Sequence, residues 1–375
     1  MPLPEPAPLK PAIDPIEQAP LWQDEQRKKQ FQSWLEGISE RFSLDRSSVR
    51  LASADASFRR YLRVNTKQGA FGATLIIMDA PPDKENSQPF VQIATLLENA
   101  GIRSPQVLDW NEPHGFMLLT DLGSLTMMQV MDPKSPPPLN LYLQAIDALI
   151  AWQLASREGV LPPYDYALLR REIDLFPQWY LKENRKVTLN AKQTKVMEDA
   201  FEAIIASNLR WPSVYVHRDF MPRNLMVADD AQSLGALGVL DFQDAVYGPI
   251  TYDIASLMRD AFLSWDEDFC LDVTIRYWDK ARKAGLPVGD DFGEFYRGVE
   301  WMGLQRHLKI AGIFARLTLR DGKPKYLADT PRFISYIRAT CDRYIELKPL
   351  LRLIEDIEGI VQPINLAYPR LNTTN

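Results

Sequence analysis

The predominant period of the hydrophobic pattern changes near Gly123, and this change restricts the possible folds more than any other feature. Before it, short apolar runs are separated by polar or glycine-containing breaks, which is typical of strands. The predicted strands are 50–53, 58–64, 71–78, 106–110 and 116–119. After it, apolar residues recur every three or four positions, which is typical of helices. The predicted helices are 139–157, 166–182, 191–207, 266–284 and 292–316.

Each part also contains elements of the other kind. The apolar residues from Phe31 to Phe42 predict an amphipathic helix, and a second helix, 89–100, ends at Gly101, since glycine is a common C-cap. Three short strands are predicted within the helical part, at 214–216, 225–227 and 238–240. The pattern therefore predicts the α+β class with two lobes: a small antiparallel β lobe with one internal helix, and a larger, mainly helical lobe.

These observations divide the chain into four parts. Residues 1–20 contain seven prolines and are predicted to be a disordered tail, with a docking ligand as the alternative. Residues 21–123 are predicted to form the smaller lobe and a hinge, and 124–365 the helical lobe. Residues 366–375 are predicted to be a C-terminal tail.

Composition excludes several classes of protein. The net charge of the 375-residue chain is −6, which argues against nucleic acid as the main partner, because phosphate binding needs a basic face. The two cysteines, Cys270 and Cys341, form no C-x-x-C pair and suit a reducing compartment. The sequence has neither a signal peptide nor a stretch of roughly 18 apolar residues. We therefore predict a cytoplasmic protein that does not bind membranes.

The strongest chemical signal lies at the ends of two predicted strands in the helical part. After the first strand comes His217-Arg218-Asp219, with Asn224 five positions beyond Asp219, and Asp241 follows another strand. Phosphoryl transfer needs a carboxylate that orients the acceptor hydroxyl, and hard oxygen ligands that hold Mg²⁺ against nucleotide phosphates. This set of residues can supply both. The alternative is two turns whose Asp and Asn side chains only cap the local backbone.

His217-Arg218-Asp219 with Asn224 resembles the catalytic loop of the protein-kinase-like superfamily, and Asp241-Phe242-Gln243 stands where that superfamily has Asp-Phe-Gly. The resemblance implies ATP and Mg²⁺, with Asp219 as the base and Asn224 and Asp241 as metal ligands. It also implies that Asp253 braces the catalytic loop, although a carboxylate at a helix start is an equal alternative. For His217 we predict a structural role, orienting the loop by hydrogen bonds.

The segment 249–255 is similar to aminoglycoside and choline phosphotransferases rather than protein kinases. Four stretches (53–64, 78–84, 217–244 and 304–309) most resemble the bacterial N-acetylmuramate/N-acetylglucosamine 1-kinases of cell-wall recycling. That resemblance implies phosphorylation of the anomeric hydroxyl of a small N-acetylated sugar, and a product that a sugar-1-phosphate nucleotidyltransferase would use. Arg306, His307 and Lys309 are then candidates for binding the substrate carboxylate. A solvated basic helix face is the alternative.

The nucleotide side is expected on the smaller lobe. Ser57 belongs to a loop that could cover the phosphates, and Thr120 and Leu122 stand where the family's hinge presents backbone groups to adenine. Met78 stands near the place of the usual phosphate-binding lysine, and Arg60 or Lys84 could replace it. On the alternative interpretation these are an ordinary turn, inter-lobe packing and surface charges.

Two further functions stay open at this point. One is an antibiotic or amino-alcohol phosphotransferase, whose cationic substrates suit an acidic protein. The other is a pseudokinase that acts as a binding module, supported by the absence of the strand lysine at Met78.

Overall fold

The computed structural model describes residues 20, 22, 24–54, 59–67, 69–132, 135–228 and 236–360. Apart from Pro20, the predicted tail 1–20 lies outside the described residues, as do the predicted tail 366–375 and Ser57. The chain divides into two compact units. The smaller comprises Met1–Thr95 and Ser104–Leu122, and the larger comprises Leu96–Arg103 and Gly123–Asn375. Each unit is described by itself below.

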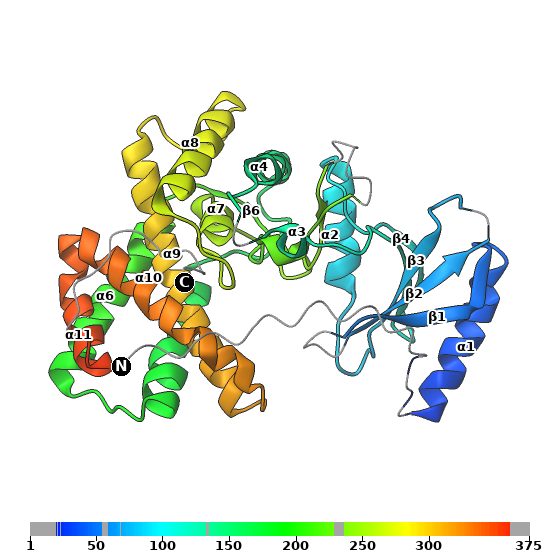
Figure 1. The fold of residues 1–375 in the computed structure, drawn as a ribbon, viewed down its shortest axis with the longest axis horizontal. Coiled ribbons are helices and arrows are strands. Elements are labelled where there is room, and N and C mark those ends of the chain that lie inside the picture. Colours follow the sequence, from blue (N-terminus) through cyan, green and yellow to red (C-terminus); the bar gives the residue numbers. More distant parts are fainter. Residues whose placement is uncertain are drawn as a thin grey trace. The chain divides into compact units, whose positions relative to one another are not determined.

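The smaller unit is built on a five-stranded sheet in which every neighbouring pair is antiparallel, in the order β1-β2-β3-β5-β4 (Figure 1). Its strands are β1 (Leu44–Ala54), β2 (Arg60–Thr66), β3 (Thr74–Asp79), β4 (Val107–Asn111) and β5 (Phe116–Thr120). Because side chains alternate across a strand, Leu62, Val64, Leu75 and Ile77 all lie on one face. That face is apolar and needs a cover.

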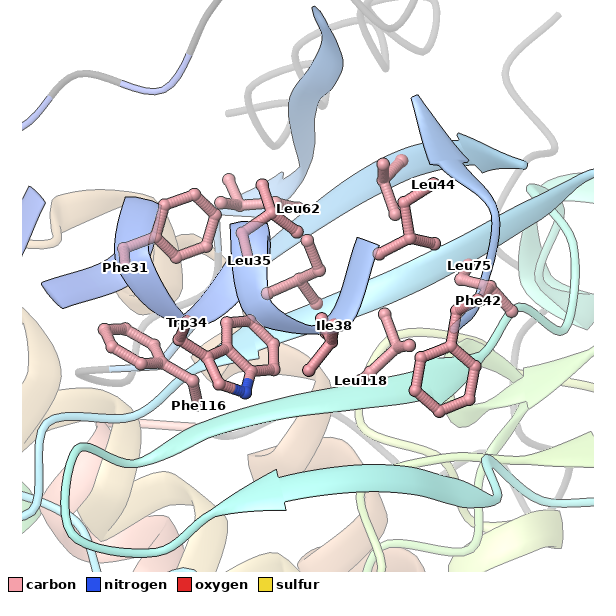
Figure 2. Packing of buried hydrophobic residues seen from close by; sticks show 12 residues of the cluster. Phe31, Trp34, Leu35, Ile38, Phe42, Leu44, Leu62, Leu75, Phe116 and Leu118 are labelled. Carbon is pink, nitrogen blue, oxygen red and sulfur yellow. The ribbon is translucent and has the colours of Figure 1, made fainter. Parts of the chain in front are cut away.

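Helix α1 (Glu25–Ser39) provides that cover. Asp24 caps its start by accepting hydrogen bonds from the N–H groups of Gln26 and Arg27. Its buried residues Phe31, Trp34, Leu35 and Ile38 lie against the apolar face of the sheet, as Figure 2 shows. The Trp34 ring stacks on Phe116 of β5, with 5.4 Å between ring centroids. The predicted amphipathic helix therefore supplies one side of the hydrophobic core of this unit, and the sheet supplies the other.

The larger unit is mainly helical (Figure 1). Its α-helices are α3 (Met127–Val130), α4 (Leu139–Leu154), α5 (Tyr166–Ile173), α6 (Ala191–Leu209), α7 (Thr251–Met258), α8 (Glu267–Lys283), α9 (Phe292–Leu319), α10 (Thr330–Arg343) and α11 (Lys348–Glu358), while α2 (Gln88–Asn99) spans the division between the units. Two short antiparallel pairs complete it: β6 (Ser213–Val216) with β9 (Val246–Pro249), and β7 (Leu225–Met226) with β8 (Gly238–Val239). Helix α9 packs against α5, α6, α7, α8 and α10, so it forms the centre of this unit.

The predicted α+β class is confirmed, but several predicted boundaries are wrong: β1 begins at Leu44 rather than at residue 50, and two other segments differ for clear physical reasons. The segment 166–182 is not one helix: α5 ends at Ile173 and a π-helix, Phe176–Asn184, follows, with Pro177 in its first turn. Proline has no N–H to continue the ladder of an α-helix, which explains the break. Strand β3 begins at Thr74 rather than at Phe71, because Gly72 turns the chain with φ +116°. None of the described helices is both long enough and apolar enough to cross a membrane.

Candidate active site

The ends of two antiparallel strand pairs carry the polar residues of the candidate site. Strand β6 runs directly into His217-Arg218-Asp219, while Asn224 precedes β7 and Asp241 comes two residues after β8. Pairing of Leu225 with Val239 draws the last two together, and the Leu240 N–H donates to the Asn224 carbonyl oxygen at 2.9 Å. Backbone pairing thus joins Asn224 to the Asp241 segment, and side-chain contacts of Asn224 and His217 join the Asp219 loop to both.

Asn224 lies between the two carboxylate-bearing segments. Its Nδ2 donates to the carbonyl oxygen of Asp219 at 2.8 Å and lies 3.4 Å from Oδ2 of Asp241. Gln243 Nε2 donates to Oδ1 of the same carboxylate at 2.9 Å. Asn224 is buried, Asp219 is half-buried and Asp241 is exposed. The carboxylate of Asp241 is therefore accessible to solvent, while Asn224 is enclosed by protein. These three predicted residues are therefore brought together.

His217 connects the two segments as a neutral ring. Its Nε2 lies 3.0 Å from the Leu240 carbonyl oxygen, and its Nδ1 accepts from the Asp219 N–H at 3.3 Å. A ring that donates through Nε2 and accepts through Nδ1 is uncharged. Burial lowers the pKa of His217 to about 4, which agrees with this state. A neutral, enclosed imidazole suits a positioning role better than proton transfer.

Asp253, near the start of α7, contacts the same loop through both of its carboxylate oxygens. Its Oδ2 accepts from the His217 N–H at 2.7 Å and its Oδ1 accepts from the Arg218 N–H at 3.0 Å. The side chain is fully buried, and burial raises its pKa to about 7 against the opposing effects of these two N–H groups and Arg306. Two buried N–H groups that β6 no longer pairs are satisfied in this way.

Two residues of the site hold a backbone conformation that disfavours side chains. Arg218 has φ +76° and Asp241 has φ +62°, both in the left-handed region, where non-glycine residues are uncommon. Such residues persist only where surrounding contacts hold them, and here the contacts of Asp253 and Asn224 do so. At both positions the left-handed conformation turns the backbone sharply just after a strand. The side chains of Asp219 and Asp241 therefore lie at strand ends.

The donor atoms fit a small divalent cation. Within the described residues, no three His, Cys, Asp or Glu side chains converge in one place, so an all-protein metal cage is absent there. Asn224 directs its NH₂ group toward Asp219 and Asp241, which leaves its amide oxygen as the atom that could coordinate a metal. One carboxylate and one amide oxygen are a suitable pair for Mg²⁺, which usually takes its remaining ligands from water and phosphate.

The three basic candidates on α9 are enclosed within the larger unit. Arg306 is 2% exposed, His307 1% and Lys309 9%. The alternative of a solvated basic helix face is therefore wrong. Arg306 donates to the Arg218 carbonyl oxygen, Lys309 pairs with Glu172 at 2.9 Å, and His307 stacks on Tyr336. Only Arg306 contacts the loop that carries Asp219.

The candidates in the smaller unit belong to different elements: Arg60 to β2, Thr120 to β5, and Leu122 and Lys84 to segments outside the strands. Arg60 pairs with Asp79, which Arg27 of α1 also contacts, so its guanidinium lies on the face that α1 covers. Thr120 is at the end of β5 and its Oγ1 accepts from the Gln106 N–H at 2.9 Å, while Leu122 is buried. Lys84 is exposed.

Sequence reasoning missed a second cation near Met78. Arg59 pairs with Glu85 at 3.1 Å, and both side chains are largely buried. Met78 itself is fully buried in β3, so it forms part of the packing of the sheet. An arginine that stands next to Arg60 in sequence could have been considered, because alternation places consecutive residues on opposite faces of a strand.

A small antiparallel unit, a helical unit, and an Asp-Asn-Asp set at strand ends together define a phosphotransferase of the kinase-like class. The chain belongs to the phosphotransferase enzyme family, whose model matches residues 48–290. It is 46% identical to the N-acetylmuramate/N-acetylglucosamine kinase of Neisseria meningitidis serogroup B, over 89% of this chain and 97% of that protein. The kinase of the same name from Pseudomonas aeruginosa is also 46% identical, over 82% and 87% respectively.

Solved structures show the same fold at low sequence identity. The ethanolamine kinase of Plasmodium vivax matches with a TM-score of 0.57 and 12% identity, covering 86% of this chain and 91% of that one. At this identity the likeness concerns the fold alone. The predicted kinase-like fold and the predicted enzyme class, a kinase, are confirmed by these comparisons together.

Proposed function

We propose that the protein transfers the γ-phosphoryl group of ATP to the anomeric hydroxyl of N-acetylmuramate and N-acetylglucosamine, in cell-wall recycling. The observation that supports the reaction is the position of Asn224 between the Asp219 carbonyl oxygen and the Asp241 carboxylate. The sugar is supported by two relatives that carry these substrates in their names at 46% identity.

In this proposal Asp219 is the general base. Its carboxylate accepts the proton of the anomeric hydroxyl while that oxygen forms a bond to the γ-phosphorus and the bond from phosphorus to the β–γ bridging oxygen breaks. ADP leaves with the bonding electrons, and the sugar 1-phosphate remains. An anomeric hydroxyl is somewhat more acidic than an ordinary alcohol, so a carboxylate is an adequate base. The half-buried position of Asp219 suits this role.

Asn224 and Asp241 would hold Mg²⁺. When bound, the ion would neutralise the negative charge of the nucleotide phosphates. The two side chains contribute fixed positions, because the β7–β8 pairing and the Asn224 contacts set the distance between them. His217 and Asp253 then support the loop that carries the base. On the nucleotide side, Thr120 and Leu122 remain candidates for contacts to adenine.

The substrates of the proposed reaction suggest where in the cell the enzyme acts and which class of enzyme uses its product. ATP is available in the cytoplasm, which is where we expect the enzyme to act. A sugar 1-phosphate is the ordinary substrate of a nucleotidyltransferase, so an enzyme of that class would consume the product. Fractionation of cells followed by detection of the protein tests the location directly.

The test is ADP release from Mg-ATP in the presence of N-acetylmuramate, N-acetylglucosamine, glucose, choline or kanamycin, in parallel with a reducing-sugar assay. Phosphorylation at the anomeric position destroys the reducing end, whereas phosphorylation elsewhere keeps it. We expect reducing sugar to disappear in a one-to-one ratio with ADP release. The Asp219→Asn variant should lose about 10²–10⁴-fold in kcat while it still binds ATP.

Three results would contradict this proposal in different ways. Turnover of kanamycin or choline without turnover of sugars would indicate the antibiotic or amino-alcohol alternative. Nucleotide binding without turnover of any acceptor would favour the pseudokinase alternative. Sugar turnover that leaves the reducing end intact would move the phosphoryl group to another hydroxyl.

A further inference from the structure

The peptide bond between Arg218 and Asp219 is held from a distant helix. Arg306 of α9 donates from Nη1 to the Arg218 carbonyl oxygen at 2.8 Å. That oxygen belongs to the peptide whose nitrogen is the backbone N–H of Asp219. On the other side of Arg218, its N–H donates to Asp253. Both polar groups of a residue with φ +76° are therefore fixed by buried side chains.

Arg306 is itself held in place by α7. Its guanidinium lies over the Tyr252 ring, 4.7 Å from the ring centroid, and its side chain is 2% exposed. A cation over the face of an aromatic ring is attracted to it, more strongly when both are removed from water. The nearby carboxylates of Asp253 and Asp219 add electrostatic attraction to the same guanidinium. Arg306 is thus held between α7 and the loop that carries Asp219.

A ring of contacts leads from Arg306 back to the side chain of Arg218. The Tyr252 hydroxyl accepts from Lys309 Nζ at 3.1 Å, and Lys309 pairs with Glu172 of α5 at 2.9 Å. Glu172 in turn pairs with Arg218 Nη2 at 2.5 Å. Burial raises the pKa of Glu172, but Lys309 and Arg218 outweigh that effect and lower it to about 2, so the carboxylate stays charged. The ring joins α5, α7 and α9 to the catalytic loop.

We propose that Arg306 is a positioning residue for the base Asp219, and that the Glu172–Lys309 pair secures the same loop through the Arg218 side chain. This inference rests on the proposed function, because it assigns Asp219 the role of base. It replaces the expectation that Arg306 and Lys309 bind the substrate carboxylate: both cations are enclosed and their charged groups contact protein groups.

The expected effect is on turnover rather than on binding. When Arg306 no longer fixes the peptide plane, the Asp219 carboxylate is displaced from the acceptor hydroxyl, and small displacements of a catalytic group lower rates about 10²-fold. We expect Arg306→Met to lower kcat by about 10–100-fold, with KM for ATP and for the sugar within about threefold of the wild-type values. Arg306→Lys retains the positive charge but lacks the planar guanidinium, so its kcat should lie between those of the wild-type protein and Arg306→Met.

A matched control separates positioning from general stability. Arg338 of α10 is also a buried arginine, 8% exposed, and pairs with Glu355 at 2.7 Å. Arg338→Met removes a guanidinium of similar burial that pairs with α11 instead. We expect it to lower the melting temperature while kcat of the folded fraction stays at the wild-type value. Steady-state kinetics, thermal melts and active-fraction measurements on the three variants are the experiment.

Several outcomes would overturn the inference. Wild-type kcat in folded Arg306→Met would do so, as would a raised KM for the sugar with unchanged kcat, which would make Arg306 a substrate ligand. An equal loss of kcat in Arg338→Met would indicate a general effect. If Arg306→Met does not fold, Arg306→Lys decides: wild-type kcat there contradicts the inference. Failure of the proposed function would look different, since the wild-type protein itself would not turn over sugars.

Discussion

His307 shows how burial changes the protonation state of a side chain from the one that its sequence suggests. In sequence it directly follows Arg306 and stands two positions before Lys309, and basic runs of this kind suggest a charged surface. In the structure its ring stacks on Tyr336 at 4.6 Å between centroids, and Nε2 lies 3.3 Å from the Arg259 carbonyl oxygen. Burial, together with Arg259 and Arg306, lowers the pKa of His307 to about 3.

This shift makes a prediction about stability and pH. An unfolded histidine binds a proton below about pH 6.5, whereas folded His307 stays neutral until about pH 3, so acidification favours the unfolded chain. Between pH 7 and pH 5 this one side chain should remove about 1–2 kcal/mol from the free energy of unfolding. In His307→Phe, which keeps a ring against Tyr336, the loss between these two pH values should be smaller by that amount.

The measurement is urea unfolding of both proteins at pH 7 and pH 5. Only the difference between the proteins is diagnostic, because the buried carboxyls of Asp253 and Asp260 have raised pKa values and stabilise the fold as the pH falls. If the free energy of unfolding falls equally in both proteins between pH 7 and pH 5, His307 does not contribute to the pH dependence of stability.

A second residue-level prediction concerns the metal. Asp241→Asn keeps the size of the side chain but removes its charge and replaces one acceptor oxygen by a donor NH₂ group, so affinity for Mg²⁺ should fall. We expect kcat to fall at least about 10²-fold at ordinary Mg²⁺ concentration, and the Mg²⁺ concentration for half-maximal rate to rise. The control is Asp244→Asn, an exposed carboxylate three positions away, which should behave like the wild-type protein. Unchanged Mg²⁺ dependence in Asp241→Asn would remove it from the metal site.

At the scale of residues, the sequence predicted those site residues that stand at the ends of recognisable strands and whose spacing is typical of kinases. Asp219, Asn224 and Asp241 were predicted because strand ends have recognisable patterns and because the spacing carries the resemblance. The enclosed positions of Arg306 and Lys309 could not be predicted, since their partners Glu172, Tyr252 and the Arg218 carbonyl oxygen come from distant segments. A helical pattern shows which residues share a face, but it does not show what covers that face.

At the scale of elements, the contact between α9 and the π-helix segment depends on one glycine. A Cβ atom built on Gly312 would lie 2.4 Å from the carbonyl carbon and oxygen of Leu175. Backbone atoms of the neighbouring segment cannot move aside as a flexible side chain could. Gly312→Ala should therefore separate the two elements and lower the free energy of unfolding by about 1–3 kcal/mol.

A control for this prediction exists in helix α1. Gly37 is also a helical glycine, but a Cβ atom there would meet nothing within 4 Å. Gly37→Ala should leave stability unchanged or raise it by about 0.5–1 kcal/mol, because alanine loses less conformational entropy in a helix. Denaturant unfolding compares the two variants, and a neutral Gly312→Ala would show that the contact with Leu175 can relax without loss.

Most elements were predictable from hydrophobic period, but some were not. The helices α4, α6, α8 and α9 follow long periodic segments, and their centres were predicted. The π-helix after α5 was not, because apolar spacing looks continuous across Pro177. Strand β9 was also missed: Val246–Pro249 has only four residues and contains a glycine and a proline, and only its pairing with β6 makes it a strand.

At the scale of the whole molecule, the structure consists of two units with their own cores. In the smaller unit, Trp34 fills the space between α1 and β5 and donates from Nε1 to Asp109 at 2.9 Å. Trp34→Ala should destabilise this unit by about 3–5 kcal/mol. Hydrogen exchange should then increase in β1 to β5, while α6, α9 and α10 keep their protection.

Hydrogen exchange measured by mass spectrometry can follow both units in one sample. Loss of protection in α9 and α10 together with the sheet would mean that the two units unfold as one cooperative body. Unchanged protection of the sheet would mean that α1 contributes little to its stability. The division into a β unit and a helical unit was visible in the sequence because the hydrophobic period itself changes.

The left-handed backbone of Asp241 has a consequence for anyone who tries to improve this protein by selection. Glycine would adopt φ +62° at lower conformational energy than aspartate, so Asp241→Gly should withstand heat as well as the wild-type protein or better. The same substitution deletes the carboxylate that we assign to the metal. A library screened only for heat resistance would therefore enrich dead enzymes at this position, and a useful selection must require growth on the sugar in every round.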